Sequence, residues 1–320
     1  MTFSRSARRQ QLAGRIAAGQ GGVVHRAQLR DVGIDRWAVR NEVAGGRWSV
    51  LGRHTVAVTG PASWPAPERG PADWPARAFW AVWESGSGAV LDGPSALQAA
   101  GLVRVEERRL HVTVPSGAPR VDLPGVRRHQ TRQVVRAPGQ RLPRAPTEVA
   151  VLNAAEWART DRQAALYVVS SVQQGLVAPD RLLRAWSRRR RSRRRRLVDA
   201  VVRDACEGAQ ALGELDFAAL CRRYRLPAPT RQVVRRGRRG RVYLDVLWEE
   251  LGIAVEVEGA QHTWGLAAVD DALRQNDLMI ADVVVLRLPV LGLRLQPEAF
   301  MQQVARALRV AAQRRIGMVG

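Results

Sequence analysis

The sequence contains no lysine, since all 51 basic residues among its 320 positions are arginines. A lysine general base, Schiff base or phosphate-binding ammonium is therefore excluded from every site in this chain. Arginine stays charged and is a poor general base, although its forked guanidinium suits phosphates. Because only 29 acidic residues oppose the 51 basic ones, the formal net charge is +22. This excess favours polyanionic partners, either nucleic acid or an acidic membrane surface.

Cysteine and long apolar runs are also scarce. The two cysteines, Cys206 and Cys221, form no CxxC pair, which argues against a structural zinc site or a disulfide scaffold and fits a reducing compartment. The best apolar run, Val283–Leu286, ends at Arg287 and falls far short of the ~20 residues of a membrane span. The first residues, MTFSRSARRQQ, lack the apolar centre of a signal peptide. We therefore expect a cytoplasmic protein without a membrane partner.

The length predicts two or three domains, and a hydrophobic content of 46% is enough to build their cores. Segments rich in glycine and proline, together with one arginine run, mark candidate boundaries. We expect a mixed α/β chain with a helical N-terminal module over 1–60, a Pro/Gly-rich linker over 61–75, an α+β region over 76–145, a helical segment with the arginine run over 146–200, and an α/β domain over 201–320.

The first 60 residues have the pattern of a winged helix-turn-helix. Helical spacing and glycine breaks predict three helices, Ser6–Ala18, His25–Val32 and Arg36–Ala44. Asp35 is a suitable N-cap for the third helix. Two β-prone segments follow, Arg47–Leu51 and His54–Thr59. Trp37 and Trp48 are expected in the core of this module.

The segments GGVVHRAQL, DRWAVRNEVAGGRW and HTVAV, with GAVLDGPSALQAAGL further along, resemble the start of AbiEi-type antitoxins of type IV toxin–antitoxin systems. The resemblance spans roughly residues 1–130. It implies a DNA-binding winged helix, with the 36–44 helix in the major groove and Arg36, Arg40 and Arg47 facing DNA. The alternative interpretation is that these arginines form a solvated helix face.

An arginine run occupies Ser187–Arg196, where eight of the ten residues are Arg188, Arg189, Arg190, Arg191, Arg193, Arg194, Arg195 and Arg196. Such a run cannot form a core. It is either a solvated linker or a nonspecific clamp for phosphates. Without it the formal charge is still 22 − 8 = +14, so the basic character is distributed, and DNA binding should depend steeply on salt.

The C-terminal region is the most regular part of the sequence. The predicted elements are a helix over Ala211–Arg225, strands over Arg231–Arg236, Arg241–Trp248 and Ile253–Glu258, a helix over Leu266–Ile280, a strand over Val283–Leu288 and a helix over Pro297–Arg314. The order α-β-β-β-α-β-α predicts a mixed sheet flanked by helices.

Carboxylates concentrate in the hairpin of this region. Alternation places Glu256 and Glu258 on one face of their strand. If the hairpin loop covers residues 249–252, Asp245 lies directly opposite Glu256, at a separation where like charges are destabilising. A divalent cation between the two carboxylates removes that repulsion, and Mg²⁺ prefers such oxygen ligands.

Two more residues extend this site. His262 follows the strand end and is placed to accept a proton from an attacking water, a task that histidine performs well near neutral pH. Glu214, on the preceding helix, is a candidate for a further metal contact.

This region resembles the PD-(D/E)XK nuclease superfamily, in particular the domain related to very-short-patch-repair (Vsr) endonucleases, over about residues 205–310. The features that carry the resemblance are Glu214, the LPAP break at 226–229, Asp245, the VEVEG segment at 255–259, His262 and the RQND segment at 274–277. It implies that Asp245, Glu256 and the main-chain carbonyl of Val257 bind Mg²⁺ or Mn²⁺ and that His262 is the base. The superfamily's lysine position holds Glu258.

Each of these residues also has a structural interpretation. The acidic pattern can be a solvated sheet face, His262 a loop or capping residue, and Glu214 a surface residue. Arg274 is expected either to contact phosphate or to pair with Asp270 along its helix.

Two functions therefore stay open. One is a DNA-binding endonuclease that hydrolyses phosphodiesters with Mg²⁺ or Mn²⁺. The other is a non-catalytic AbiEi-like antitoxin or repressor with a degenerate nuclease fold, which binds an operator such as that of a cognate toxin gene. Charge alone does not exclude RNA, but no RNP-like aromatic strand or GXXG clamp supports it.

Overall fold

The computed structural model describes residues 5–58, 73–105, 107–207, 217–236, 242–258, 269, 272–273, 276 and 285–317. The protein is mixed α/β, as the sequence predicted. It divides into two compact units, Met1–Asn153 and Ala154–Gly320. None of the described helices combines the length and the apolar content that a membrane span requires.

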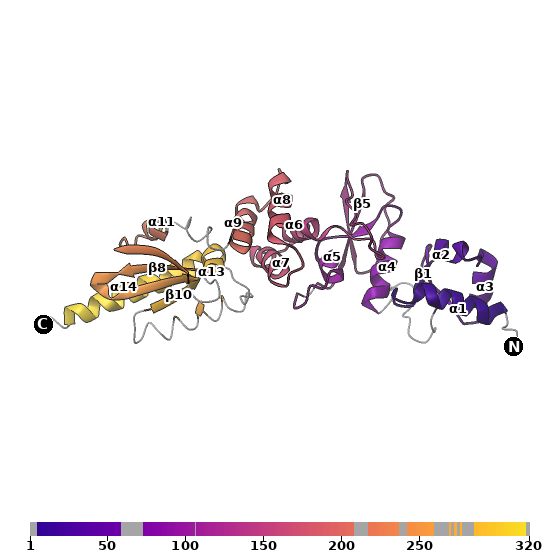
Figure 1. The fold of residues 1–320 in the computed structure, drawn as a ribbon, viewed down its shortest axis with the longest axis horizontal. Helices are drawn as coiled ribbons and strands as arrows, with labels where there is room; N and C mark the ends of the chain where they lie inside the picture. Colours follow the sequence, from indigo (N-terminus) through magenta and orange to yellow (C-terminus); the bar gives the residue numbers. More distant parts are fainter. Residues whose placement is uncertain are drawn as a thin grey trace. The chain divides into compact units, whose positions relative to one another are not determined.

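The first unit alternates short helices and strands (Figure 1). Its elements are α1 (Arg5–Ala17), β1 (Val23–His25), α2 (Arg26–Asp31), α3 (Arg36–Ala44), β2 (Ser49–Val50), β3 (Thr55–Ala57), α4 (Trp74–Glu84), β4 (Val90–Leu91), α5 (Gly93–Ala99), β5 (Leu110–Pro115) and β6 (Val126–Thr131). Helix α6 (Thr147–Trp157) runs across the boundary between the units.

The N-terminal module, residues 5–58, packs α1, α2 and α3 on a three-stranded antiparallel sheet of order β1-β3-β2. The three helices and the β2–β3 hairpin lie where the sequence predicted them, and Asp35 caps α3 by accepting a hydrogen bond from the Ala38 amide. The sequence did not predict β1, which is only three residues long and depends on pairing with β3. Its Val24 lies opposite Val56, and both are fully buried.

The two tryptophans of this module differ in burial. Trp48 is 2% exposed, which confirms the prediction that it lies in the core. Trp37 is 54% exposed, so the same prediction was wrong for it. Helix α3 turns its buried face inward through Val39, and at 3.6 residues per turn Trp37 lies about 200° around the helix from Val39.

Helix α4 ties the N-terminal module to the rest of the first unit. The Glu84 carboxylate accepts hydrogen bonds from the amides of Arg53 and His54, both at 2.9 Å, and from the Thr55 hydroxyl at 2.7 Å. Gly52 permits this approach, because a Cβ atom there would lie 2.4 Å from the Glu84 carboxyl carbon. Most of the predicted 61–75 linker lies outside the described residues, and its last two positions begin α4.

The second unit starts with helices and ends with a sheet. Its elements are α7 (Asp161–Gln173), α8 (Pro179–Arg188), α9 (Arg195–Glu207), α11 (Phe217–Arg223), β7 (Arg231–Arg236), β8 (Val242–Trp248), η4 (Glu249–Leu251), β9 (Ile253–Glu258), β10 (Val285–Pro289), α13 (Val290–Leu295) and α14 (Pro297–Gly317). The predicted Leu266–Ile280 helix is mostly outside the described residues, although residues 269, 272–273 and 276 are helical. Helix α13 was not predicted.

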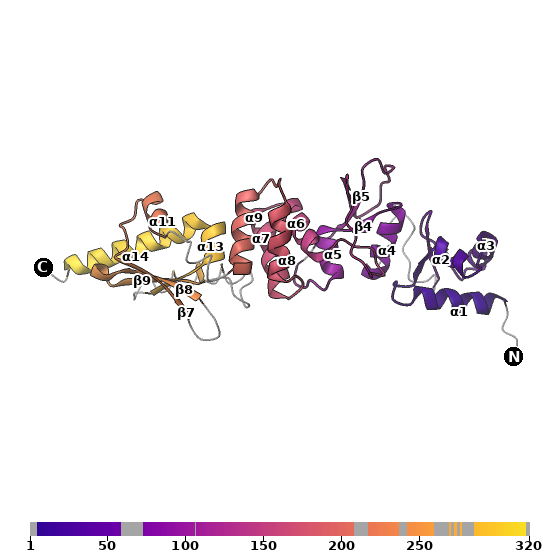
Figure 2. The same cartoon turned by 45° about the horizontal axis from the view of Figure 1, so that its top comes forward.

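The four strands form one sheet of order β10-β9-β8-β7. Strands β7, β8 and β9 are antiparallel, and β10 joins β9 in parallel, as expected of a crossover strand. Helix α14 lies along one face of this sheet, as Figure 2 shows. The residues of the buried face and of α14 form the core, namely Val246, Val255, Val257, Leu286, Leu288, Phe300, Met301 and Val304. The opposite face carries the acidic residues.

Candidate functional site

The register of the β8–β9 hairpin brings two carboxylates together. Asp245 pairs with Glu256, and Trp248 with Ile253, as the sequence predicted. Between the strands, η4 ends at Gly252, whose φ of 62° is the left-handed conformation that closes the turn. Directly opposite side chains of an antiparallel pair lie on the same face, so Asp245 and Glu256 are neighbours on the sheet.

Glu258 is on the same face of β9, two residues further along. The burial pattern alternates along the strand, with Val255 and Val257 fully buried and Glu256 and Glu258 partly exposed. The side chain of Glu256 is 36% exposed and that of Glu258 is 13% exposed. We call Asp245, Glu256 and Glu258 the acidic face.

An arginine on the neighbouring strand contacts this acidic face. Arg287 of β10 pairs in parallel register with Glu256. Its Nε lies 3.6 Å from a Glu256 carboxylate oxygen and 4.0 Å from one of Glu258. From the sequence, Arg287 was noted only as the residue that ends an apolar run. No local pattern indicates which strand β10 pairs with, so its place beside Glu256 was not predicted. One guanidinium therefore partly balances two carboxylates.

A buried asparagine holds the main chain of Arg287. Asn276 is fully buried, and its amide nitrogen donates to the Arg287 carbonyl at 2.9 Å and to the Gln303 side chain at 3.2 Å. The Arg287 amide donates in turn to the Asn276 side-chain oxygen at 3.1 Å. The described contacts of Asn276 thus fix β10 against α14 through Gln303, which positions Arg287 beside the acidic face.

Three predicted site residues, Glu214, His262 and Arg274, lie outside the described residues. Within the described part of the chain, no three His, Cys, Asp or Glu side chains form a recognisable metal-binding group. Asp245 and Glu256 still have the donor chemistry of a Mg²⁺ site, because this ion takes one or two protein carboxylates and keeps several waters or substrate oxygens.

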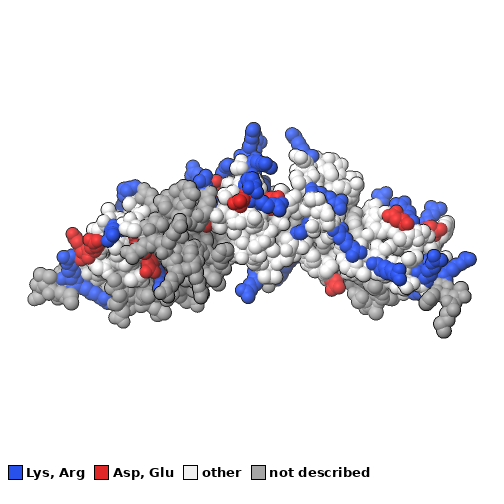
Figure 3. Space-filling model, viewed as in Figure 1, with Lys and Arg blue, Asp and Glu red and all other residues white. Residues whose placement is uncertain are grey.

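In the N-terminal module, two of the three predicted DNA-contacting arginines flank an exposed aromatic ring. The guanidinium carbons of Arg36 and Arg40 lie 5.2 and 5.9 Å from the centroid of the Trp37 ring. All three side chains are exposed on α3. Figure 3 shows that arginines are the prevailing charged side chains on the visible described surface.

The third arginine, Arg47, is also exposed, and it has a structural partner within the module. Its Nε donates to the carboxylate of Glu42, which is 1% exposed. Arg9 at 2.7 Å and the Ser6 hydroxyl at 2.8 Å bind the same carboxylate. Burial opposes ionisation of Glu42, but the hydrogen bonds from Arg47 and Ser6 outweigh it and hold the pKa below its usual value. Ser6 and Arg9 therefore tie α1 to α3 through Glu42, and Arg47 adds a third contact to the same carboxylate.

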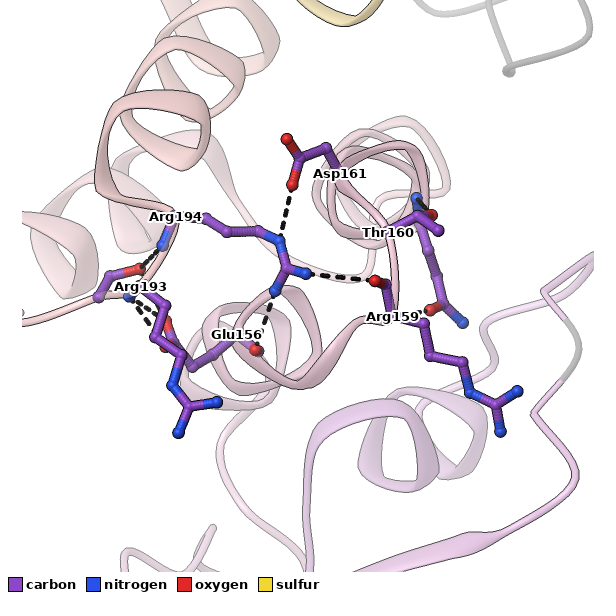
Figure 4. Close-up of polar contacts among 8 residues, drawn as sticks. Glu156, Arg159, Thr160, Asp161, Arg193 and Arg194 are labelled. Atoms are coloured by element: carbon purple, nitrogen blue, oxygen red, sulfur yellow. Dashed lines mark hydrogen bonds and ion pairs between the residues drawn. The ribbon is translucent and has the colours of Figure 1, made fainter.

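The arginine run is also partly built into the fold, around Glu156 (Figure 4). The Glu156 carboxylate accepts hydrogen bonds from the Ser192 hydroxyl at 2.7 Å and from the Arg193 amide at 2.9 Å. Burial opposes ionisation of Glu156, yet these two hydrogen bonds lower its pKa below the usual value. Arg194 binds the Asp161 carboxylate at 2.8 Å and the carbonyls of Glu156 and Arg159 at 3.2 and 3.4 Å.

The run is therefore not a simple solvated linker. Its first arginine ends α8, its last two begin α9, and the Arg195 guanidinium lies 4.9 Å from the Trp186 ring centroid. The exposed arginine side chains of the run are Arg188, Arg190, Arg191, Arg193, Arg195 and Arg196. These six stay candidates for phosphate contacts.

A histidine pair joins β5 and β6 in the first unit, with His111 buried and His129 half-buried. His111 Nδ1 is 3.1 Å from His129 Nε2, and the ring centroids are 5.1 Å apart. Burial lowers the pKa of His111 to about 4, and burial together with His111 lowers that of His129 to about 3. Both rings are neutral at neutral pH. No local sequence pattern indicated this pair, because the parallel register of β5 and β6 brings the two rings together.

No protein-family model matches the chain, and no curated protein is significantly similar to it. Among solved structures, the RV2827C protein from Mycobacterium tuberculosis is similar with 18% sequence identity and a TM-score of 0.34. The match covers 66% of this chain and 78% of that one.

Proposed function

We propose that this protein binds DNA and hydrolyses its phosphodiester bonds at the acidic face of the second unit, with Mg²⁺ or Mn²⁺ as cofactor. The observation that carries the proposal is the pairing of Asp245 with Glu256 on adjacent strands. Two carboxylates held side by side repel each other, and a divalent cation removes that repulsion.

The layout of the second unit supports a nuclease of the Vsr-related PD-(D/E)XK type. An antiparallel three-stranded meander, a parallel fourth strand and a helix along the apolar face leave the acidic face uncovered by α14. This agrees with the element order that the resemblance implies. Glu258 stands where that superfamily has lysine, and the chain has no lysine to supply from elsewhere.

The residues of the acidic face fit a hard divalent ion. Asp245, Glu256 and the carbonyl of Val257 would hold it, and a bound metal supplies positive charge for the phosphate and lowers the pKa of a coordinated water. Arg287, within ion-pair distance of Glu256, is placed to orient a phosphate oxygen that approaches this face. His262, which lies outside the described residues, remains the predicted base.

The N-terminal module supports DNA as the substrate. Its three helices and small sheet have the element order of a winged helix, in agreement with the AbiEi-type resemblance. In such modules a helix enters the major groove and phosphate contacts set its position. Arg36 and Arg40 are exposed on α3, as that role requires.

A cleavage assay tests the proposal. We expect Asp245→Asn and Glu256→Gln each to reduce nicking of plasmid DNA with Mg²⁺ by at least about a hundredfold, as losses of key electrostatic groups typically do. Glu249→Gln, which changes an exposed acid in the turn between the same strands, is the matched control and should keep wild-type activity. Wild-type nicking by both acidic-face variants would exclude this site.

A second candidate is a non-catalytic DNA-binding regulator, an AbiEi-like antitoxin or repressor that binds the operator of a toxin gene. The observation that favours it is the contact of Arg287 with Glu256 and Glu258, which reduces the charge of the acidic face without a metal. Titration with Mn²⁺ separates the two functions. Binding that Asp245→Asn abolishes supports the nuclease, and DNA binding without any metal site supports the regulator.

A further inference from the structure

A hollow in the N-terminal module has the chemistry of an anion site. It lies between α2, α3 and the turn that precedes β3, and its volume is about 330 Å³. Its charged lining residues are Arg26, Arg30, Arg36, Arg53 and Asp35. Four arginines and one aspartate therefore line this space.

The single carboxylate is already engaged. Asp35 caps α3, and its Oδ1 accepts the Ala38 amide at 2.8 Å. The four arginines stay charged at any physiological pH, and their planar forks match the oxygens of a phosphate. The electrostatic potential in the hollow is therefore positive and favours an anion.

One arginine of the hollow has a buried donor without an acceptor. The Nε atom of Arg26 is buried and has no hydrogen-bond partner among the described residues. Leaving a buried donor unpaired is unfavourable, and more so on a charged group. An anion in the adjoining hollow would offset the positive charge of this arginine.

Two stacked histidines complete the lining. The rings of His25 and His54 lie 5.4 Å apart and within 6° of parallel. His25 Nδ1 accepts the Ala27 amide at 3.0 Å, so the neutral ring carries its proton on Nε2. Burial and the neighbouring His54 lower the pKa of His25. A bound anion would reverse this trend, because it stabilises the charged ring.

We propose that this hollow binds a phosphate group, either a backbone phosphate of DNA or the phosphate of a free ligand. The proposal rests on the four arginines of the lining and on the single aspartate, whose Oδ1 already caps α3. The choice of DNA as the source rests on the proposed function, whereas the phosphate chemistry does not. A hydrolytic site in the second unit is not needed for it.

The test compares two charge-matched variants of the full chain without divalent metal. Arg26→Gln/Arg53→Gln removes two guanidiniums from the hollow, and Arg8→Gln/Arg15→Gln removes two exposed ones from α1 of the same module. Fluorescence anisotropy measures affinity for a 20-base-pair duplex at several salt concentrations, and calorimetry measures affinity for inorganic phosphate. We expect the hollow variant to bind its ligand about tenfold more weakly than the control variant.

The two probes identify the source of the phosphate. A larger loss of duplex affinity in the hollow variant than in the control, with a smaller salt slope, assigns the hollow to DNA. A loss confined to inorganic phosphate assigns it to a free ligand. Equal affinities of the two variants for both probes overturn the proposal. Thermal melts verify that each variant folds. If the double variant of the hollow does not fold, Arg30→Gln replaces it, because Arg30 is an exposed residue of the same lining. Because cleavage is not measured, failure of the nuclease proposal leaves this result intact.

Discussion

Carboxylates meet arginines in both units, but in contrasting ways. Glu42 of the N-terminal module is 1% exposed and accepts hydrogen bonds of 2.8 Å or less from Ser6, Arg9 and Arg47. Glu256 of the acidic face is 36% exposed and meets Arg287 at 3.6 Å. A carboxylate whose oxygens are saturated by its own chain has no capacity left for a ligand. A partly exposed one beside a second acid keeps that capacity, so Glu42 is structural and Glu256 is the candidate for chemistry.

Among single substitutions, the largest effect on stability should come from Glu42. Glu42→Gln removes the charge that Arg9 and Arg47 share, and we expect it to destabilise the protein by about 2 kcal/mol, since hydrogen bonds to charged groups contribute about 1.5–3 kcal/mol each. Chemical denaturation measures the change. Glu256→Gln should alter the free energy of unfolding far less while it abolishes cleavage. Equal destabilisation by the two variants would break the contrast between a structural and a functional carboxylate.

The next effect is a loss of stability in acid, which the His111–His129 pair of the first unit should cause. Because the pKa values of His111 and His129 fall to about 4 and 3, the unfolded chain binds protons that the folded chain does not. The stability that neutral rings provide is therefore present above pH 6.5 and is lost as the pH falls toward 4. For each such proton the loss is about 1.4 kcal/mol per pH unit, or roughly 2 kcal/mol at pH 5.

Thermal melts between pH 7 and 5 check this expectation. His129→Gln removes one of the two groups and should flatten the dependence of Tm on pH. A variant with the same slope as the wild type would contradict the assignment of acid sensitivity to this pair.

A smaller effect is expected at the surface of the N-terminal module. Trp37→Ala should weaken DNA binding roughly fivefold, because the ring holds the Arg36 and Arg40 guanidiniums through cation–π contacts of about 0.5–1 kcal/mol each, and should leave the melting temperature nearly unchanged. Trp37→Phe keeps part of the ring and should recover part of the affinity. Val32→Ala, another exposed apolar residue of this module, is the control. Anisotropy titrations in which both alanine variants bind DNA like the wild type would refute a contact by Trp37.

The smallest effect concerns Arg287 and the acidic face. Arg287→Gln removes the cation beside Glu256 and Glu258, and we expect affinity for Mn²⁺ to rise about two- to fivefold, since exposed ion pairs are worth about 0.2–1 kcal/mol. Arg309→Gln removes an exposed charge from α14 of the same unit and should change the affinity less. Calorimetry distinguishes them. An unchanged affinity in Arg287→Gln would show that Arg287 does not compete with a metal at this face.

Much of the second unit was predictable because its information is local. Alternation along 253–258 specified which residues share a face, and a four-residue turn fixed the register that pairs Asp245 with Glu256. The α/β class and most strands followed from the same periodicity. Glu214, His262 and Arg274 lie outside the described residues, so those predictions remain predictions.

Other features were not predictable from the sequence because they depend on long-range packing. Trp37 was expected inside because tryptophan is apolar, but the buried face of α3 is set by the contacts of Val39 with the rest of the module. Arg47 is exposed and its Nε binds Glu42 within the module, so its predicted contact with DNA stays a prediction. The arginine run was read as a linker or a clamp, and Glu156, more than thirty residues away, ties part of it down.

The sequence by itself determined the basic character of the protein, the absence of any lysine chemistry and the pairing of the two acids across a short hairpin. Each of these depends on composition or on neighbours within a few residues. Only the tertiary structure decided that Arg287 lies beside those acids, that four arginines surround a hollow and that Glu42 is saturated. These contacts join strands and helices distant in the chain, and the packing that unites them leaves no local pattern.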